Sequence, residues 1–328
     1  MPTIHTTMIL NFLLALSTTA PVLATFSTRV VYQSPTGLFL ENIAVRPSGK
    51  LLLNSVASPT LHTLDPAAPN ATLEEVYTFP NSTGLTGIVE YQPELYALVS
   101  SVINLTTRRA ALGSVAIWRV DFTSKTPAAT QIVGIPESTV INGLSVVPGN
   151  PDLILASDSN IGAVYEINMR TGTARIAIQD STMTPGAPEP AHGINGLHVR
   201  NGFLYFANTQ RGTFSRVPLA VQRGAVLQAG AVQVLGSVQD AVEEYDDFAL
   251  DGEGHAWVAT HPGALTLYSS LANGTWTQET AAGDPEGNYA VFTEPTSAAF
   301  GRGGCEKILY VTTGGGQIVS VDTGSADV

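Results

Sequence analysis

Six polar residues recur along the chain in a similar local sequence, and they are the residues best suited to chemistry. Each begins a short pattern in which small and apolar residues follow one polar residue. These residues are Glu41, Thr86, Asn142, Asn195, Asp246 and Thr296, at successive spacings of 45, 56, 53, 51 and 50 residues. If the fold brings them to one axis, they offer two carboxylates, two amides and two hydroxyls. Oxygen sets of this kind bind Ca²⁺ or Mg²⁺ rather than zinc or iron.

Three further side chains close to these positions could transfer protons, and we predict them as catalytic residues. They are His192, Asp247 and His261. Histidine and aspartate are common general acids and bases. His192 is the first choice because a loop histidine just before a repeat would face the shared axis. We expect His198 to pack between repeats as readily as to face the axis, and His255 to lie at the surface.

The spacing of the six copies predicts the architecture, because a repeat of about fifty residues suits a blade of four strands. Short β-rich runs separated by Gly and Pro turns fill the intervals, and no stretch has convincing helical periodicity. We therefore predict an all-β fold, a six-bladed β-propeller with four antiparallel strands per blade. The run 26–32 has no blade of its own and is expected to close the ring as an outer strand. Residues 25–328 are predicted to form this single domain.

In a propeller the innermost strands line a central channel, so the six polar residues would lie at one rim of it. Aromatic residues near this rim could form the walls of a substrate pocket. The predicted pocket residues are Tyr245, Trp257, Tyr289, Thr86 and Thr296. For the three aromatic residues, the alternative is a place in the core between blades. The segments 181–192 and 283–294 are long enough to act as lids.

Composition excludes several classes of partner and cofactor. Fifteen Lys and Arg residues against 27 Asp and Glu residues give a formal net charge of −12. An acidic surface repels phosphate, so we expect neither nucleic acid nor an anionic membrane as a partner. The sequence has no Gly-x-Ser-x-Gly elbow and no phosphate-binding glycine loop, so no nucleotide cofactor is expected.

The one cysteine, Cys305, excludes an intrachain disulfide framework and any multi-cysteine zinc or iron–sulfur site. A redox cofactor is therefore not expected. A single cysteine could still be a nucleophile, but a small buried side chain at the start of a strand is the preferred interpretation.

The N-terminal segment and four glycosylation sequons predict passage through the secretory pathway and secretion. Residues 1–24 contain a short apolar run followed by Val22-Leu23-Ala24, which fits a signal peptide cleaved after Ala24. The run is too short for a membrane span, and no later run is long enough for one. Asn-x-Ser/Thr sites occur at Asn70, Asn81, Asn104 and Asn273. We expect these asparagines to lie on surface loops.

At the repeated positions the chain resembles the senescence-marker-protein/gluconolactonase superfamily of six-bladed propellers. The resemblance lies in Glu41, in the Asn-Gly-Leu that begins at Asn142 and again at Asn195, and in Asp246 followed by Leu250-Asp251-Gly252. It covers nearly all of the chain after residue 24. It implies that Glu41, Asn142, Asn195 and Asp246 hold a divalent cation, usually Ca²⁺, at the bottom of an active-site funnel.

The chain departs from the superfamily pattern in two places. Asn42-Ile43 stands where Gly-Pro usually follows the first acidic residue, and Tyr245-Asp246-Asp247 stands where Pro-Asp-Gly is usual. The alternative interpretation makes the two Asn-Gly pairs ordinary turns at the entry to strands.

The segments 41–47, 141–144, 194–197 and 245–248 are also similar to a fungal, secreted branch of this superfamily, encoded in secondary-metabolite clusters. Some of its members are hetero-Diels–Alderases of tropolone sesquiterpenoid biosynthesis. The resemblance implies the coupling of a tropolone o-quinone methide to a humulene-type alkene, which forms a dihydropyran. The substrates would be small, apolar and aromatic, and orienting them would supply much of the rate acceleration.

Two other functions fit the same residues. One is a Ca²⁺-dependent lactonase or esterase, in which the cation polarises a carbonyl and Asp247 or His192 activates water. The other is a propeller that binds a partner without catalysis. No residue pattern indicates an oligomer.

Overall fold

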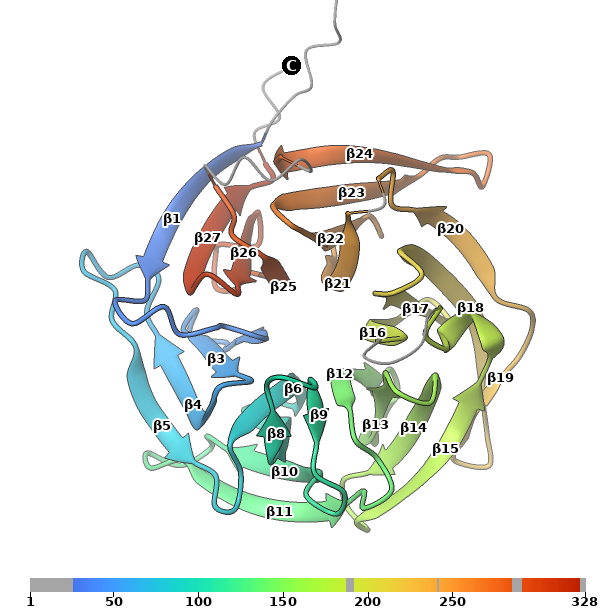
Figure 1. The fold of residues 1–328 in the computed structure, drawn as a ribbon, viewed down its shortest axis with the longest axis horizontal. Helices are drawn as coiled ribbons and strands as arrows, with labels where there is room; N and C mark the ends of the chain where they lie inside the picture. Colours follow the sequence, from blue (N-terminus) through green and yellow to red (C-terminus); the bar gives the residue numbers. More distant parts are fainter. Residues whose placement is uncertain (1–25, 187–191, 241, 285–290, 325–328) are drawn as a thin grey trace, which may run out of the picture.

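The computed structural model describes residues 26–186, 192–240, 242–284 and 291–324 of the chain. Six antiparallel sheets stand around a central axis, one after another in chain order (Figure 1). The predicted six-bladed β-propeller is therefore confirmed. A three-residue 3₁₀ turn, Ser181–Met183, is the only helical element in these ranges. No helix within them is long and apolar enough to cross a membrane.

Each blade begins with its innermost strand and proceeds outward. Blade 1 contains β2 (Ile43–Val45), β3 (Leu51–Ser55), β4 (Ser58–Leu64) and β5 (Glu74–Thr78). Blade 2 contains β6 (Gly84–Gln92), β7 (Leu95–Ser101), β10 (Ala116–Asp121) and β11 (Ala128–Gly134). Blade 3 contains β12 (Ile141–Val147), β13 (Asn150–Asp158), β14 (Ala163–Asn168) and β15 (Thr173–Gln179).

The second half of the ring follows the same plan, with one added strand. Blade 4 contains β16 (Ile194–Arg200), β17 (Phe203–Asn208), β18 (Thr213–Gln222) and β20 (Gln233–Ser237), and β19 (Ala225–Gln228) also pairs with β18. Blade 5 contains β21 (Glu244–Leu250), β22 (Ala256–His261), β23 (Ala264–Ser270) and β24 (Trp276–Gly283). Blade 6 contains β25 (Pro295–Phe300), β26 (Ile308–Thr313) and β27 (Gln317–Asp322), and β1 (Ser27–Gln33) pairs with β27 as its outermost strand.

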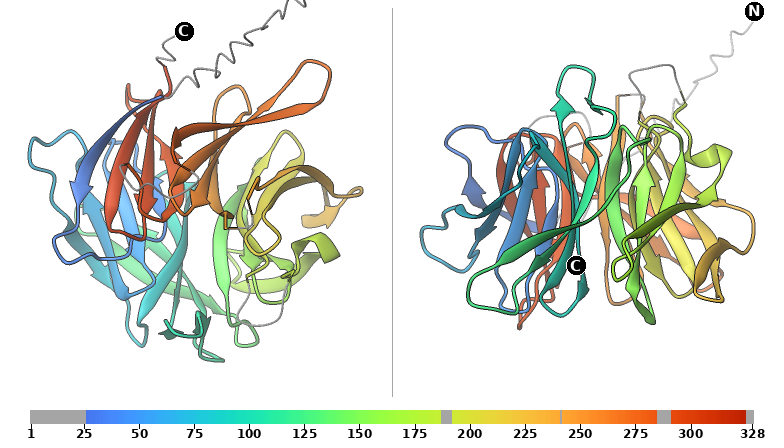
Figure 2. Two further views of the ribbon diagram at one scale, coloured as in Figure 1. Left: turned by 45° about the horizontal axis from the view of Figure 1, so that its top comes forward. Right: turned by 90° about the horizontal axis from the view of Figure 1, so that it is seen from below.

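One hairpin interrupts this plan. The two-residue strands β8 (Ile103–Asn104) and β9 (Arg109–Ala110) lie between the second and third strands of blade 2. The hairpin stands out from one face of the ring, on which the inner strands begin (Figure 2). We call this end of the central channel the upper opening, and the opposite end the lower opening.

Apolar side chains between neighbouring sheets form the core, in keeping with the alternation of each strand. One such cluster joins blades 2 and 3 and contains Ile117, Ile154 and Ile167, all fully buried. Strands covered on both faces by neighbouring blades read as nearly continuous apolar runs, as β17 does. The core thus lies in the gaps between the blades and leaves the channel to the first strand of each.

Most inner strands carry a β-bulge where the repeated polar residue stands. The register shifts at Leu85/Ile88, Ile141/Leu144, Ile194/Leu197, Tyr245/Phe248 and Pro295/Ser297. A bulge releases its residues from the regular ladder and turns their side chains. Neighbouring polar residues of one strand can therefore face different parts of the channel.

Glycine after the polar residue allows adjacent inner strands to approach closely. A Cβ on Gly87 would lie 2.3 Å from the Asn142 carbonyl oxygen, and one on Gly143 would lie 2.9 Å from the Asn195 carbonyl oxygen. At Gly196 a Cβ would lie only 2.0 Å from Asp247 Oδ1. The Thr-Gly and Asn-Gly pairs are therefore required by contact between blades, beyond any role in turns.

We predict that Gly196→Ala destabilises the fold by about 1–3 kcal/mol, the usual cost of inserting a group into a packed site. The Asp247 side chain and backbone would have to shift, because a new Cβ would also lie 2.6 Å from Asp247 Cα. Urea unfolding curves measure the effect. Gly252→Ala is the matched control, since a Cβ there meets nothing within 4 Å. Equal stability of the two variants would contradict this account of the glycines.

Candidate functional site

The predicted rim residues do lie at the starts of the inner strands, at the upper opening, and all six are buried. They are not equivalent. The Thr86 hydroxyl donates to the Ile141 carbonyl at 2.7 Å, and the Thr296 hydroxyl donates to the Leu40 carbonyl at 2.6 Å. Both threonines therefore fasten one blade to the next, and their hydroxyl protons are engaged.

Asp246 and His261 form a pair of titratable groups at the upper opening. His261 Nε2 lies 3.5 Å from Asp246 Oδ2, somewhat longer than a good hydrogen bond. Their strands, β21 and β22, are paired in blade 5. The His261 side chain is 23% exposed and the Asp246 side chain 13% exposed. The predicted catalytic residue His261 thus adjoins a predicted metal ligand.

Burial and neighbouring charges shift the pKa values of this pair. Burial disfavours the imidazolium, but contact with Asp246 and the negative charges of Glu244 and Glu294 outweigh it, so the pKa of His261 is raised. Burial also raises the pKa of Asp246, against the opposing effect of His261. The pair therefore favours a protonated imidazole next to a carboxylate that holds a proton more tightly than usual.

Glu41 is the second carboxyl group of this cluster. Burial raises its pKa well above the usual value, and the nearby charges of Asp246 and Asp247 raise it further. Arg108, from the β8–β9 hairpin, opposes the shift. Glu41 is thus an acid whose ionised form is costly unless a cation is near.

The donor set at the upper opening fits a hard cation. Asn195 Nδ2 donates to Thr209 Oγ1 at 2.9 Å, whereas Asn195 Oδ1 is buried without a hydrogen-bond donor. Two carboxyl groups, Glu41 and Asp246, accompany this unused amide oxygen, and Asn142 is buried at the same rim. The described residues contain no group of three His, Cys, Asp or Glu side chains arranged for a metal. Amide oxygens would therefore have to complete a cation site, as Ca²⁺ permits.

The β8–β9 hairpin and His192 come together beside the upper opening. His192 Nε2 lies 3.4 Å from the Arg108 carbonyl oxygen, which joins the segment before blade 4 to the hairpin of blade 2. His192 is therefore at the mouth of the channel, as its place in the sequence suggested. Of the two segments predicted as lids, 187–191 and 285–290 lie outside the described residues.

Exposed apolar side chains gather on loops of the same face. These loops join second to third strands, or one blade to the next. The exposed residues on them are Val102, Leu105, Leu112, Ile161 and Val242. On the loops of the opposite face, Leu271 is the one large apolar residue of the described chain with comparable exposure. The upper opening therefore has an apolar approach to an acidic interior.

Asp247 lies apart from the Asp246–His261 pair. Asn42 Nδ2 and Ser297 Oγ both donate to Asp247 Oδ2 at 3.0 Å, and the Phe248 backbone NH donates to Oδ1 at 2.8 Å. These contacts tie blades 1, 5 and 6 across the channel. We call Asn42, Asp247 and Ser297 the channel belt.

Below the channel belt, a cavity of about 530 Å³ opens at the lower opening. Its lining includes the three belt residues but not Glu41, Asp246 or His261. His198 also lines it, with Nε2 3.7 Å from Asp247 Oδ1. We call this cavity the lower pocket. The predicted catalytic residues are thus divided between the two ends of the channel.

Two of the aromatic residues expected as pocket walls are core residues instead. Tyr245 is fully buried, and its hydroxyl lies 2.7 Å from that of Tyr268. Trp257 is 3% exposed and stacks edge-on against Phe26. Both follow the alternative that aromatic residues between blades belong to the core. Tyr289 lies outside the described residues.

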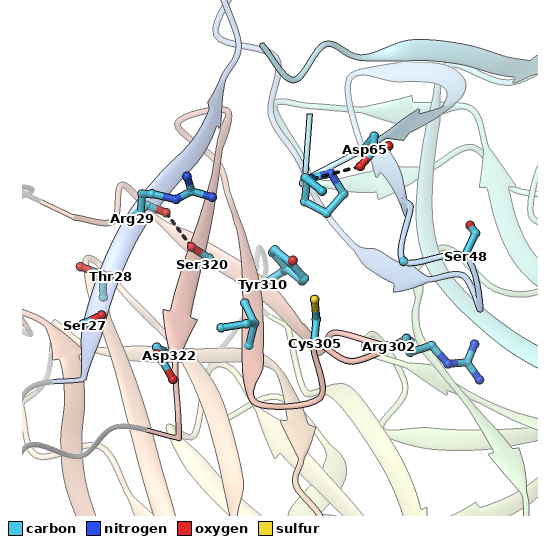
Figure 3. Close-up of a pocket in the computed structure, with 15 residues that line it drawn as sticks. Ser27, Thr28, Arg29, Ser48, Asp65, Arg302, Cys305, Tyr310, Ser320 and Asp322 are labelled. Carbon is cyan, nitrogen blue, oxygen red and sulfur yellow. Dashed lines mark hydrogen bonds between the residues drawn. The ribbon is translucent and has the colours of Figure 1, made fainter. Parts of the chain in front are cut away.

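A second cavity, of about 540 Å³, lies away from the channel, between blades 6 and 1. Figure 3 shows Tyr310 and Cys305 on one side of it and Arg29 on β1. The expectation that Cys305 is buried is wrong, because it occupies the loop before β26 and is exposed.

The remaining residues singled out in the sequence are His255 and the four sequon asparagines. His255 is partly buried, with Nδ1 3.2 Å from Asp251 Oδ2 at the opposite face from His261. The four sequon asparagines, Asn70, Asn81, Asn104 and Asn273, are all exposed. Their glycosylation and the signal peptide, which lies outside the described residues, stay predictions.

Sequence reasoning missed Arg108, Asn42 and Ser297. Arg108 belongs to an insertion within blade 2, and the longer spacing of 56 residues after Thr86 was the available signal. Asn42 and Ser297 follow the polar residue in their repeats, where blades 2, 3 and 4 have glycine. A comparison of this second position among the copies would have identified the channel belt.

Comparisons with known proteins agree with this fold and extend to the sequence. No family model matches the chain. A protein from Phoma sp named "Putative hetero-Diels-Alderase" is 26% identical over 326 residues, which cover 92% of this chain and 89% of the relative. A similarly named protein from Sarocladium schorii is 28% identical, with 92% of this chain and 80% of the relative covered.

Solved structures share the fold at lower identity. The calcium-binding protein regucalcin from Agrobacterium tumefaciens has a TM-score of 0.62 at 18% identity, with coverage of 90% of this chain and 94% of that one. A gluconolactonase from Xanthomonas campestris has a TM-score of 0.59 at 15% identity, with 93% of each chain covered. The chain is thus similar in fold to regucalcin and a gluconolactonase, and in sequence to two proteins whose names read "Putative hetero-Diels-Alderase".

We predict that Glu41→Gln stabilises the cation-free protein at about pH 8 by roughly 0.5–3 kcal/mol, the usual range for one substitution. A carboxyl group whose pKa is raised in the folded chain destabilises it above that pKa and has no such effect below the unfolded value of 4.5. The gain should therefore vanish at about pH 4. Urea unfolding at both pH values, in chelator, measures it. Glu253→Gln, at a side chain that is 83% exposed, is the control and should change little.

Proposed function

We propose that the protein is a hetero-Diels–Alderase that couples a tropolone o-quinone methide to a humulene-type alkene, forming a dihydropyran. The observation that carries the proposal is the pairing of half-buried His261 with buried Asp246 at an opening approached over apolar side chains. Similarity over 92% of the chain to two proteins whose names read "Putative hetero-Diels-Alderase" supports it.

In this proposal His261 acts as the acid that generates the quinone methide. The substrate is a hydroxymethyl tropolone, whose exocyclic C–O bond breaks as water leaves. Protonated His261 donates a proton to the departing hydroxyl, and a carboxylate such as Glu41 accepts the proton of the ring hydroxyl. The raised pKa of His261 suits an acid, because more of the imidazole is protonated near neutral pH. The raised pKa of Glu41 suits a base, because its ionised form takes up a proton more readily than an ordinary carboxylate does.

The cycloaddition itself requires correct orientation of its two partners rather than an acid, a base or a nucleophile. One C–C and one C–O bond form between the heterodiene and the alkene, and no atom leaves. Holding two apolar partners in one orientation removes several kcal/mol of the barrier, because the entropy is lost on binding. The apolar loops of the upper face would take up such substrates, and Arg108 would offer a hydrogen bond to the oxygen of the heterodiene.

We predict that His261→Gln slows product formation from the hydroxymethyl tropolone by about 10²–10⁴-fold, the usual contribution of a general acid. The same variant should retain most activity when the quinone methide is generated chemically, since its acid is then no longer needed. Product yield and diastereomer ratio, followed by chromatography, measure both reactions.

His255→Gln provides the matched control, because that histidine lies at the opposite face, beside Asp251. It should behave as the wild type with either precursor. A wild-type product mixture identical to that formed without protein would overturn the proposed function. An equal loss with both precursors would remove His261 from the dehydration step.

A Ca²⁺-dependent lactone hydrolase is the second candidate. The observation that favours it is the buried, unpaired Asn195 Oδ1 beside the carboxyl groups of Glu41 and Asp246. Glu41, Asn142, Asn195 and Asp246 would hold the cation, which would supply polarisation of a substrate carbonyl. The fold likeness to a gluconolactonase agrees with this candidate.

We predict that Ca²⁺ raises the midpoint of thermal unfolding of the wild-type protein and that a chelator reverses the rise. A ligand that binds only the folded chain stabilises it by about 2.7 kcal/mol at 100 times its dissociation constant. Glu41→Gln and Asp246→Asn should abolish the response, whereas Glu253→Gln should keep it. No response in the wild type would exclude a Ca²⁺ site and with it the second candidate.

A further inference from the structure

The lower pocket has the properties of a small-molecule site that the proposed reaction does not use. Its volume of about 530 Å³ lies within the range of ligand pockets, roughly 300–1,000 Å³. Inner strands from all six blades line it, mainly with aliphatic side chains that include Val89, Leu144 and Leu250. The channel belt forms its inner end, and the charged lining residues Glu90, Arg200 and Arg302 lie nearer its mouth. This combination is typical of a pocket that orients an apolar molecule by one polar head.

The channel belt forms the inner end of the lower pocket and presents one buried carboxylate. Asp247 accepts hydrogen bonds from Asn42, Ser297 and the Phe248 backbone. These donors are neutral, so they stabilise the anion without cancelling its charge. The closest side chain able to carry a positive charge is His198, whose Nε2 is 3.7 Å from Oδ1 and whose side chain is 34% exposed.

The other charged groups of the lower pocket are engaged near its mouth. Arg302 pairs with Glu90 and donates to the Val45 carbonyl at 3.0 Å. Arg200 donates to the carbonyl oxygens of Asp251 and Gly252. The inner end is therefore negative, while the mouth is held by interactions among the protein's own groups.

We propose that the lower pocket is a second binding site and that it takes an alkyl- or arylammonium ion. The ammonium group meets Asp247 and the apolar body lies along the strand-lined walls. The carboxylate is already desolvated and hydrogen-bonded in the folded chain, so binding requires desolvation of the ligand alone. An ion pair at this depth is stronger than one at the surface because the surroundings screen it less.

The length of the pocket sets the size of the ligand. Asp247 and Leu250 are three residues apart on β21, which corresponds to about 10 Å of extended strand. A ligand with a primary amine, a four-carbon chain and one phenyl ring has about this length. 4-Phenylbutylamine is therefore a suitable probe, and 4-phenylbutan-1-ol is its neutral counterpart of nearly equal shape.

Calorimetric titration of the full chain at about pH 8, where the amine is protonated, tests the proposal. The amine should bind at least about tenfold more tightly than the alcohol, as expected for a hydrogen bond between charged groups. Asp247→Asn should reduce amine affinity to that of the alcohol. Glu253→Gln removes an exposed carboxylate on the same face and should leave the affinity within about twofold.

Two further variants locate the binding. Glu294→Gln removes a carboxyl group near His261 at the upper opening and should also leave amine affinity within about twofold. A large loss in that variant would place the amine at the upper opening and overturn the proposal. Val89→Phe fills part of the lower pocket without touching the channel belt, so it should weaken both probes.

The remaining outcomes are equally decisive. Equal affinity for amine and alcohol, or no binding of the amine at millimolar concentration, would overturn the proposal. Unchanged amine affinity in Asp247→Asn would do the same. If Asp247→Asn does not fold, because the channel belt joins three blades, Val89→Phe decides, and undiminished amine binding in it contradicts the assigned site.

Discussion

The close approach of six strand starts around one axis is the constraint on which the rest of the structure depends. Blades 2, 3 and 4 meet it with glycine after the polar residue, and a Cβ at Gly87 or Gly196 would lie 2.3 Å or less from an atom of the next blade. Blades 1, 5 and 6 have Asn42, Asp247 and Ser297 at this position, and these three join one another through hydrogen bonds. The glycines therefore leave the space that the channel belt occupies.

The channel belt divides the channel into an upper part, which holds interacting acid and base groups, and a lower part, which holds the hydrogen-bonded carboxylate of Asp247. Above the channel belt, burial raises the pKa of both Glu41 and Asp246, and the charge of Asp246 raises that of Glu41 further. These groups lie beside His261 and beneath an apolar rim. Below the channel belt, Asp247 accepts hydrogen bonds from neutral donors, and Glu90 is paired with Arg302 nearer the mouth of the lower pocket. Since adjacent residues of β21 supply both sides, the bulge between Tyr245 and Phe248 is what separates an acid–base cluster from a fixed anion.

The architecture could be predicted from the sequence because each repeat carries the same order of turn and β-rich run, and the inner-strand starts followed from the same copies. Side-chain direction could not be predicted, because bulges break the two-residue alternation on which such a prediction relies. Tyr245 was expected at a pocket wall and Asp247 near the acid–base cluster for this reason. Arg108 belongs to an insertion that the repeat does not contain, and the exposure of Cys305 depends on the path of a single loop.

We propose that the reaction takes place at the upper opening, on the Asp246–His261 side of the channel belt. A crystal structure of the protein with the cycloadduct of the proposed reaction tests this most directly. We expect the product within contact distance of His261, beneath the β8–β9 hairpin that carries Arg108. A cycloadduct bound in the lower pocket, against Asp247 and His198, would contradict it.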